Sequence, residues 1–212
     1  MEFALSDDQR MLQESIRGVL ETTSSLDEVR KVAHGDTALR DKMSAKLAEL
    51  GTGMALVPEA QGGLGLGLLD AVVVQEAFGA AVAPAGFTGI AEQRNEWRGK
   101  IASGDVRFGV AVAERTGARE GAGVEARDGK LNGKALFAME TDGASHLLIC
   151  DTTGRLHVAL ASDVERNDLT TIYKTRDFAE LVFDGTPATP LDGDNEIGAA
   201  ADRMVAAGRL LL

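Results

Sequence analysis

Residues 56–79 read Leu56-Val-Pro-Glu-Ala-Gln-Gly-Gly-Leu-Gly-Leu-Gly-Leu-Leu-Asp-Ala-Val-Val-Val-Gln-Glu-Ala-Phe-Gly79. A glycine-rich segment therefore opens directly onto a long apolar run. Its glycines, at 62, 63, 65 and 67, are expected where the backbone needs positive φ or passes close to another segment. The run from Asp70 to Ala77 predicts a helix with apolar residues on nearly every face, a pattern typical of a helix buried on all sides.

A glycine-rich turn before a helix can also cradle a phosphate. A phosphate-binding loop would carry Lys followed by Ser or Thr at the start of the helix, and a β-branched strand would precede the turn. Residues 56–79 have neither feature. The pattern favours a tight turn between two helices, with glycines that allow close packing.

The rest of the N-terminal half also has a helical pattern. Ser6 precedes two acidic residues and Gln9, a capping-box pattern that predicts the start of a helix. Residues 22–36 predict a short helix, and residues 37–50 predict another that Gly51 ends. After a break over 79–88, one more short helix is expected over 90–101. Residues 1–104 are therefore predicted to form an all-helical domain.

From residue 105 the pattern changes to short apolar or alternating runs at roughly ten-residue spacing, which predict strands. Asp128-Gly129 is typical of a β-hairpin turn. We predict an antiparallel β-sandwich or small barrel over 105–195 and the start of a C-terminal helix over 196–212, so the fold class is α+β. Because this last helix reaches Leu212 with an apolar stripe and no cap residue, we expect another subunit or further chain to cover it.

The composition narrows the functional classes. The 212 residues carry 22 Lys and Arg against 33 Asp and Glu, a net charge of −11, which argues against nucleic acid as a partner. The chain does not open with a basic and then apolar leader, and no apolar run reaches the roughly 18 residues of a membrane span. With Cys150 as its one cysteine, the chain is expected in a reducing compartment and is predicted to be cytoplasmic.

Sequence signals for metal or nucleophilic chemistry are weak. The histidines, His34, His146 and His157, are too scattered for a metal site, and there is no Cys-x-x-Cys or Gly-x-Ser-x-Gly. Glu59 and Glu76 are the candidate carboxylates of the helical half, and a capping or paired role is expected for both. The sequence therefore predicts no metal site and assigns no catalytic residue.

Several stretches resemble the acyl-CoA dehydrogenases, and together they cover the length of the chain. Residues 57–67 and the following Gln75-Glu76 resemble the N-terminal helical domain of that family. Met1 to Arg10 resembles its usual opening, Lys130-Leu-Asn-Gly resembles its hairpin, and residues 175–187 resemble the end of its β-domain. The resemblance implies the family's order of domains: a helical bundle, a β-domain and then a C-terminal helical domain.

The resemblance also implies a reaction. In the family, FAD lies between the β-domain and the C-terminal helical domain. A Glu of the C-terminal domain removes the α-proton of an acyl-CoA thioester while a hydride passes to the flavin. This implies an oxidoreductase of lipid metabolism with FAD as cofactor and an acyl-CoA as substrate. The catalytic base would come from outside residues 1–212.

Two β-domain loops contact the flavin in the family, and their counterparts here are altered. The first has Ala113-Glu114 where the family has Thr-Glu, so Ala113 lacks the hydroxyl that a Thr would offer to a flavin oxygen. The second has Phe137-Ala138-Met139, with Met139 at the position of a Thr. Phe137 and Met139 either pack against a flat ring or are ordinary residues of a sandwich core. These five residues are the predicted cofactor-binding set.

Three kinds of function remain open. The first is an acyl-CoA dehydrogenase-type enzyme that receives its base from outside this chain. The second is a non-catalytic partner subunit of a hetero-oligomeric acyl-CoA dehydrogenase, which the altered loops favour. The third is an interaction module that keeps only the fold. Because family members assemble as dimers or tetramers, the resemblance implies a homo- or hetero-oligomer of subunits with this fold.

Overall fold

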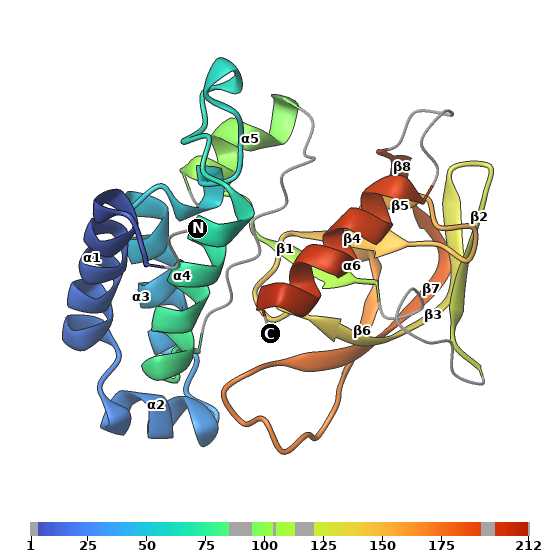
Figure 1. Ribbon diagram of the computed structural model, residues 1–212. Coiled ribbons are helices and arrows are strands. Elements are labelled where there is room, and N and C mark those ends of the chain that lie inside the picture. Colours follow the sequence, from blue (N-terminus) through green and yellow to red (C-terminus); the bar gives the residue numbers. More distant parts are fainter. Residues whose placement is uncertain (1–3, 85–94, 104, 113–120, 192–197, 212) are drawn as a thin grey trace. The chain divides into compact units, whose positions relative to one another are not determined.

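A computed structural model gives the fold of the protein and describes residues 4–84, 95–103, 105–112, 121–191 and 198–211 (Figure 1). The chain divides into two compact units. The first takes in residues up to 91, residues 98–104 and the last three residues, and the second takes in residues 92–97 and 105–209. The first unit is helical and the second is built on a β-sheet, so the predicted α+β class is confirmed.

Helices and short 3₁₀ turns build the first unit, and they follow the predicted segments. They are α1 (Asp7–Thr23), α2 (Leu26–Ala33), α3 (Ala38–Glu49), η1 (Thr52–Met54), η2 (Glu59–Gln61) and α4 (Leu68–Ala80). Ser6 caps α1 as predicted, because its hydroxyl accepts a hydrogen bond from the Gln9 N–H and its own N–H donates to the Gln9 side chain. Gly51 follows α3 with φ +71, the left-handed conformation that ends a helix.

One apolar core holds these helices together. Ile16 and Leu20 of α1, Met43 of α3 and Phe78 of α4 are each no more than 2% exposed and lie in the same cluster. Fully burying a side chain of this size contributes about 1.5–3 kcal/mol. A polar contact adds to the pairing of α1 with α4, since Gln9 Nε2 donates to Asp70 Oδ1 at 2.8 Å.

The glycine-rich turn of the first unit packs closely, as its sequence predicts. The Gly65 N–H donates to the Val57 carbonyl at 2.8 Å, so the turn folds back on the segment before it. A Cβ at Gly63 would lie 2.0 Å from the Val57 carbonyl oxygen, which only glycine avoids. Gly62 and Gly65 have φ of +82 and +62. The glycines therefore serve backbone packing, and α4 begins directly after them.

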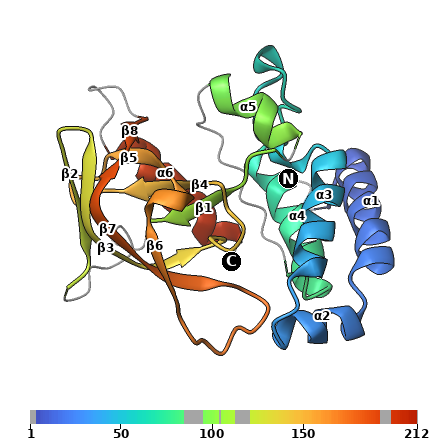
Figure 2. The same cartoon turned by 180° about the vertical axis from the view of Figure 1, so that it is seen from behind.

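A curled sheet forms the second unit (Figures 1 and 2). Its strands are β1 (Phe108–Ala111), β2 (Gly123–Arg127), β3 (Lys130–Met139), β4 (His146–Cys150), β5 (Leu156–Leu160), β6 (Glu165–Asp168), β7 (Phe178–Pro187) and β8 (Thr189–Pro190). Their order is β6-β7-β3-β1-β4-β5-β8, with β2 against β3. The pairs are antiparallel except β1 with β4, which is parallel. The sheet is therefore mixed, whereas the sequence predicted a fully antiparallel domain.

The sheet curls around its own apolar core. Leu131, Ala135, Ile149 and Leu181 are at most 1% exposed and belong to one cluster inside the curled sheet. The predicted hairpin joins β2 to β3, with Asp128 and Gly129 both at positive φ. The 3₁₀ turn η4 (Ala161–Asp163) precedes β6.

Two further helices complete the described chain. Helix α5 (Asn95–Ala102) is shared between the two units, and α6 (Ala199–Leu211) follows the β-strands in the sequence, with Ala201 fully buried. Within the described residues, no helix is long and apolar enough to cross a membrane.

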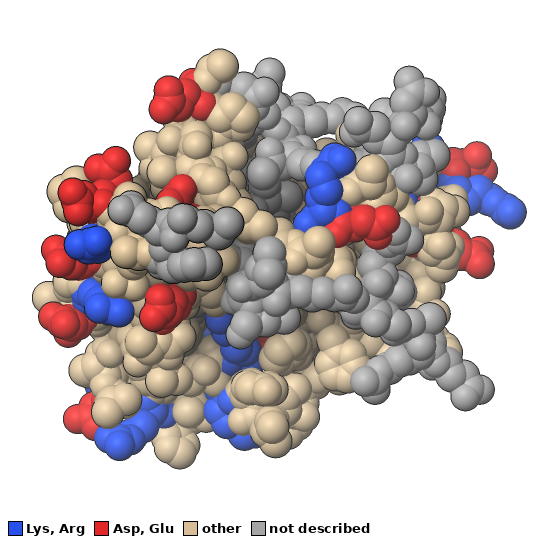
Figure 3. Space-filling model, viewed as in Figure 1, with Lys and Arg blue, Asp and Glu red and all other residues tan. Residues whose placement is uncertain are grey.

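Charged side chains of both signs are interspersed on the surface. Figure 3 shows Lys and Arg lying among Asp and Glu over the face in view. On the helices, Arg30 pairs with Asp27 and Lys46 with Glu49, each three residues apart. Such exposed pairs stabilise a helix by only about 0.2–0.5 kcal/mol each, so they contribute to solubility more than to stability.

Candidate cofactor site

A β-bulge interrupts strand β3 at the predicted cofactor-binding residues. Ala135 pairs with Leu181 and Ala138 pairs with Ala179, so β3 has one residue more than β7 between these pairs. Both Ala135 and Ala138 lie in the core with no exposed surface. Strict alternation would put residues 135 and 137 on the same face, and the extra residue removes Phe137 from the core face.

Phe137 therefore lies at the surface of the second unit. Its side chain is 37% exposed and its φ is +55. Met139 is half-buried and pairs with Phe178 of β7 and Val110 of β1. The placement of Phe137 argues against its role as an ordinary core residue, whereas Ala138 is a core residue whose side chain faces away from solvent. Ala113 and Glu114, the other two members of the predicted set, lie outside the described residues.

The backbone after the bulge is strained. Phe137 and Glu140 have φ of +55 and +54, in the left-handed region that side chains other than glycine seldom adopt. Each such residue costs about 1–3 kcal/mol and persists only where the surrounding structure holds it in place. Strain of this kind is concentrated at ligand sites, so two strained residues around Met139 mark this end of β3 as a candidate site.

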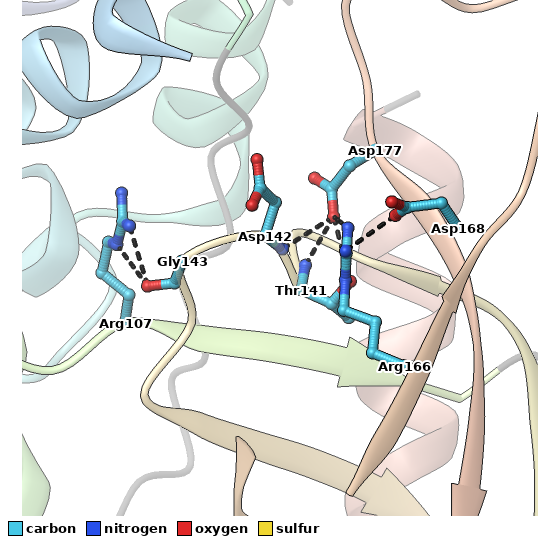
Figure 4. A network of polar contacts seen from close by, with 7 residues as sticks. All are labelled: Arg107, Thr141, Asp142, Gly143, Arg166, Asp168 and Asp177. Atoms are coloured by element: carbon cyan, nitrogen blue, oxygen red, sulfur yellow. Dashed lines mark hydrogen bonds and ion pairs between the residues drawn. The ribbon is translucent and has the colours of Figure 1, made fainter. Parts of the chain in front are cut away.

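The Asp177 carboxylate holds the segment that follows (Figure 4). Its Oδ2 accepts hydrogen bonds from the Thr141 N–H at 2.8 Å, the Thr141 hydroxyl at 3.0 Å and the Asp142 N–H at 2.9 Å. Thr141 is 4% exposed, and the Asp177 side chain is 10% exposed. Hydrogen bonds to a charged acceptor contribute about 1.5–3 kcal/mol each, enough together to offset the strain at Phe137 and Glu140.

Arg166 of β6 supports the same contact. Its Nε donates to the Thr141 hydroxyl oxygen at 2.8 Å, and another guanidinium nitrogen lies 3.6 Å from Asp177 Oδ2. Its remaining terminal nitrogen lies 2.7 Å from Asp168, whose side chain is 76% exposed. The guanidinium thus lies between a shielded carboxylate and a solvated one and orients both Thr141 and Asp177 (Figure 4).

Two more arginines hold the residues on either side of Thr141-Asp142. Arg176 lies 3.1 Å from the Glu140 carboxylate and balances its charge at the second strained position. Arg107, which precedes β1, donates twice to the Gly143 carbonyl, at 3.1 and 2.7 Å. Gly143 has φ +66, and a Cβ there would meet the Arg107 guanidinium at 2.0 Å. Residues 140–143 are therefore held by side chains from three other parts of the second unit.

Two side chains at this end of β3 have the chemistry to pack on a flat aromatic ring. Phe137 presents an exposed aromatic ring and Met139 a polarisable thioether on the same short segment, and both groups pack well on aromatic surfaces. Neither side chain can donate a hydrogen bond. Contacts of these two side chains with a flavin would therefore be apolar, and polar contacts with its pyrimidine end would have to come from backbone groups or other residues.

Sequence reasoning missed the residues that hold this segment. Asp177 and Thr141 are 36 positions apart, and Arg166 lies on a strand that the sequence pattern did not single out. Thr175-Arg176 stands out in the sequence only through its resemblance to the end of the β-domain of acyl-CoA dehydrogenases. No local pattern pairs an Asp with a distant Thr N–H, because that contact depends on the register of β3 against β7.

A second buried polar cluster lies at the turn between β4 and β5. Asp151 Oδ2 lies 2.8 Å from His157 Nε2, and its Oδ1 accepts from the Thr153 N–H, the Thr153 hydroxyl and the Arg155 N–H. Burial raises the pKa of Asp151, but the hydrogen bonds from Thr153, His157 and Arg155 lower it more, so this pKa lies below its usual value. Within the described part of the chain, no group of three or more His, Cys, Asp or Glu is placed to hold a metal ion.

Comparison with known proteins identifies the helical part. Residues 6–105 match the family model described as acyl-CoA dehydrogenase, N-terminal domain. No curated protein matches the chain.

Solved structures share the fold across both units. An acyl-CoA dehydrogenase from Geobacillus kaustophilus gives a TM-score of 0.80 at 19% identity, over 100% of this chain and 65% of its own. The Tcur3481-Tcur3483 steroid ACAD G363A variant gives a TM-score of 0.80 at 23% identity, over 97% of this chain and 62% of its own. The ChsE4-ChsE5 complex from Mycobacterium tuberculosis gives a TM-score of 0.76 at 20% identity, over 99% of this chain and 62% of its own.

The chain spans less than two thirds of the length of each of these structures. Their fold includes both the helical unit and the curled sheet, and the family model covers the helical unit independently. Residues 6–105 therefore resemble the N-terminal domain of acyl-CoA dehydrogenases, and the chain shares the fold of the N-terminal and middle parts of solved acyl-CoA dehydrogenases.

Proposed function

We propose that this chain is part of an FAD-dependent acyl-CoA dehydrogenase that desaturates an acyl-CoA thioester between Cα and Cβ. The observation that carries the proposal is Phe137, an aromatic side chain that a bulge and a left-handed backbone turn out of the core near the end of β3. With 37% of its surface exposed, Phe137 offers apolar surface that a bound flavin ring would cover in part.

FAD, when bound, would supply the hydride acceptor for this reaction. The part of this chain is to bind and orient it: Phe137 and Met139 offer apolar surface, and the segment after them is fixed by hydrogen bonds. The general base would come from outside residues 1–212. Glu140 is one of the carboxylates at the candidate site, and its pairing with Arg176 favours a structural role for it.

A second candidate function is a partner subunit without catalytic activity. Ala113 and Met139 both stand where a hydroxyl side chain would donate to a flavin, which favours this alternative. Two of the similar structures are described as a ChsE4-ChsE5 complex and as Tcur3481-Tcur3483, names that pair two proteins. We therefore propose that this chain assembles with subunits of its own fold, as a homo- or hetero-oligomer.

The domain bounds are part of the same proposal. We propose a helical domain over 1–104, a β-domain over 105–195 that carries the candidate cofactor residues, and the start of a C-terminal helical domain over 196–212. The acidic composition and the single Cys150 support a cytoplasmic location.

Flavin content and desaturase activity test the proposal together. The protein would be purified alone and after co-expression with an acyl-CoA dehydrogenase-fold partner, and the absorbance spectrum and the FAD released per chain would be measured. Oxidation of a panel of acyl-CoA thioesters would then be followed with an artificial electron acceptor. We expect bound FAD and turnover of at least one thioester.

Each outcome separates the candidate functions. FAD and turnover that appear with this chain, and are lost in Phe137→Ala, support the enzyme. If FAD appears only in the complex, in one copy per pair and with no loss in Phe137→Ala, then the flavin belongs to the partner, and the subunit without catalytic activity is favoured. Absence of FAD from both preparations would contradict both and leave an interaction module.

A further inference from the structure

We propose that Asp177 is a positioning residue for the cofactor, since it fixes residues 140–142 and thereby the outward conformation of Phe137 and Met139. This inference rests on the proposed function, because it assigns a role toward the same flavin. Asp177 itself need not touch the cofactor. It acts through backbone groups that follow directly on the strained part of β3.

The need for a positioning residue comes from the strain. Phe137 and Glu140 both have left-handed backbones, and a chain released at this point would return to a relaxed extended conformation. In a relaxed, strictly alternating β3, residue 137 would share the core-facing side with Ala135. The outward placement of Phe137 therefore depends on contacts made by the residues after it.

Asp177 makes the most shielded of these contacts. One carboxylate oxygen accepts from two successive backbone N–H groups and from the Thr141 hydroxyl, so it fixes the direction of the chain just beyond Glu140. The carboxylate can hold this place because it immediately precedes β7, and Phe178 pairs with Met139 in the same ladder. Asp177 is thus brought to the segment by the strand that flanks the candidate site.

Arg166 contacts both partners of this hydrogen bond, the Thr141 hydroxyl and the Asp177 carboxylate. The guanidinium donates to the Thr141 hydroxyl oxygen and lies beside Asp177, so the hydroxyl is oriented to donate to the carboxylate. An Asn at 177 would keep one acceptor oxygen but lose the charge that Arg166 faces. An Ala would leave two backbone N–H groups of residues 141 and 142 without their acceptor.

A purely structural role is the competing explanation, and the chain offers a matched control. Asp151 is a buried aspartate of the same unit, and it too holds a turn through two backbone N–H groups and a Thr hydroxyl. It belongs to the turn that follows β4, whereas residues 137–142 precede that strand. Loss of Asp151 should therefore destabilise the same unit without releasing the cofactor segment.

The test compares FAD affinity in Asp177→Asn, Asp177→Ala and Asp151→Asn. Each variant would be prepared in the full protein with its partner, stripped of flavin and titrated with FAD, at a temperature where circular dichroism shows it folded. If release leaves about one chain in ten in the binding conformation, then the Kd rises about tenfold. We expect that rise for Asp177→Ala, a smaller one for Asp177→Asn, and a change of less than about twofold for Asp151→Asn.

The flavin spectrum provides a readout beyond affinity. At saturating FAD, Asp177→Ala should change the shape of the visible flavin band, because the ring environment is altered, while Asp151→Asn should leave it unchanged. Wild-type affinity and spectrum in Asp177→Ala would overturn this inference and leave the proposed function standing. An equal loss of affinity in Asp151→Asn would also overturn it. A wild-type protein that binds no FAD would remove the proposed function, and this inference with it.

Discussion

Asp151 Oδ2 lies 2.8 Å from His157 Nε2, and both side chains are buried in the second unit, at 3% and 5% exposure. The carboxylate can only accept, so the imidazole nitrogen donates the hydrogen bond. Together with Thr153 and Arg155 this pair defines the turn that joins β4 to β5. The stability of the sheet should therefore depend on the ionisation of one carboxyl group.

We expect Asp151→Asn to lower the free energy of unfolding by about 2–4 kcal/mol at pH 7, because it removes the charge from a buried, hydrogen-bonded pair. The folded pKa of Asp151 is lowered, so its contribution is present above its usual pKa of 3.8 and is lost as pH falls through the folded value. The difference in the free energy of unfolding between wild type and Asp151→Asn should thus become smaller in acid. Urea unfolding at pH 7, 5 and about 3 measures it, and a constant difference would contradict the assignment.

The variants Phe137→Gly and Phe137→Ala should differ in their free energy of unfolding. The left-handed conformation costs a side chain with Cβ about 1–2 kcal/mol, and glycine adopts it freely. Phe137→Gly should therefore be more stable than Phe137→Ala by about 1 kcal/mol, since both remove the same ring. Thermal or urea unfolding of the two variants measures the difference. An alanine variant of equal or greater stability would show that the backbone at 137 relaxes when the ring is removed.

Gly63→Ala should destabilise the helical unit by about 3 kcal/mol or more, because the added Cβ would lie 2.0 Å from the Val57 carbonyl oxygen and the backbone would have to move. Gly79, near the end of α4, is the matched control: a Cβ there meets nothing within 4 Å. Gly79→Ala should instead raise stability by about 0.5–1 kcal/mol through its higher helix propensity. Urea unfolding followed by the circular dichroism of the helices would measure the stability of both variants. A similar fall in stability for Gly63→Ala and Gly79→Ala would contradict the role of close packing at Gly63.

Ser6→Ala should cost about 1 kcal/mol, since it removes the hydroxyl that accepts from the Gln9 N–H at the start of α1. The expected loss is confined to the first turn of that helix. Hydrogen exchange of the amides of residues 7–10 would show it. Ser6→Asp is the control, because its carboxylate should keep the capping bond and favour the positive end of the helix dipole. Equal protection in wild type and Ser6→Ala would contradict the capping role.

The sequence alone determined the helices of the first unit and the position of its tight turn. Capping at Ser6, termination at Gly51 and the glycines before α4 are local effects, each set by residues a few positions apart. The strands with apolar or alternating patterns were predicted for the same reason, as was the hairpin at Asp128-Gly129, whereas β6 was not. The family was also visible in local stretches, which the match over residues 6–105 confirmed.

The tertiary structure decided the parallel pairing of β1 with β4 and the placement of the predicted cofactor residues. Alternation alone puts Phe137 in line with Ala135, and only the extra residue opposite β7 turns its ring outward while Ala138 takes the core position. The polar contacts that hold this arrangement join Thr141 to Asp177 and Arg166, which are far apart in the chain. Such contacts depend on strand register, and register is set by how the whole sheet buries its core, which no local pattern of residues records.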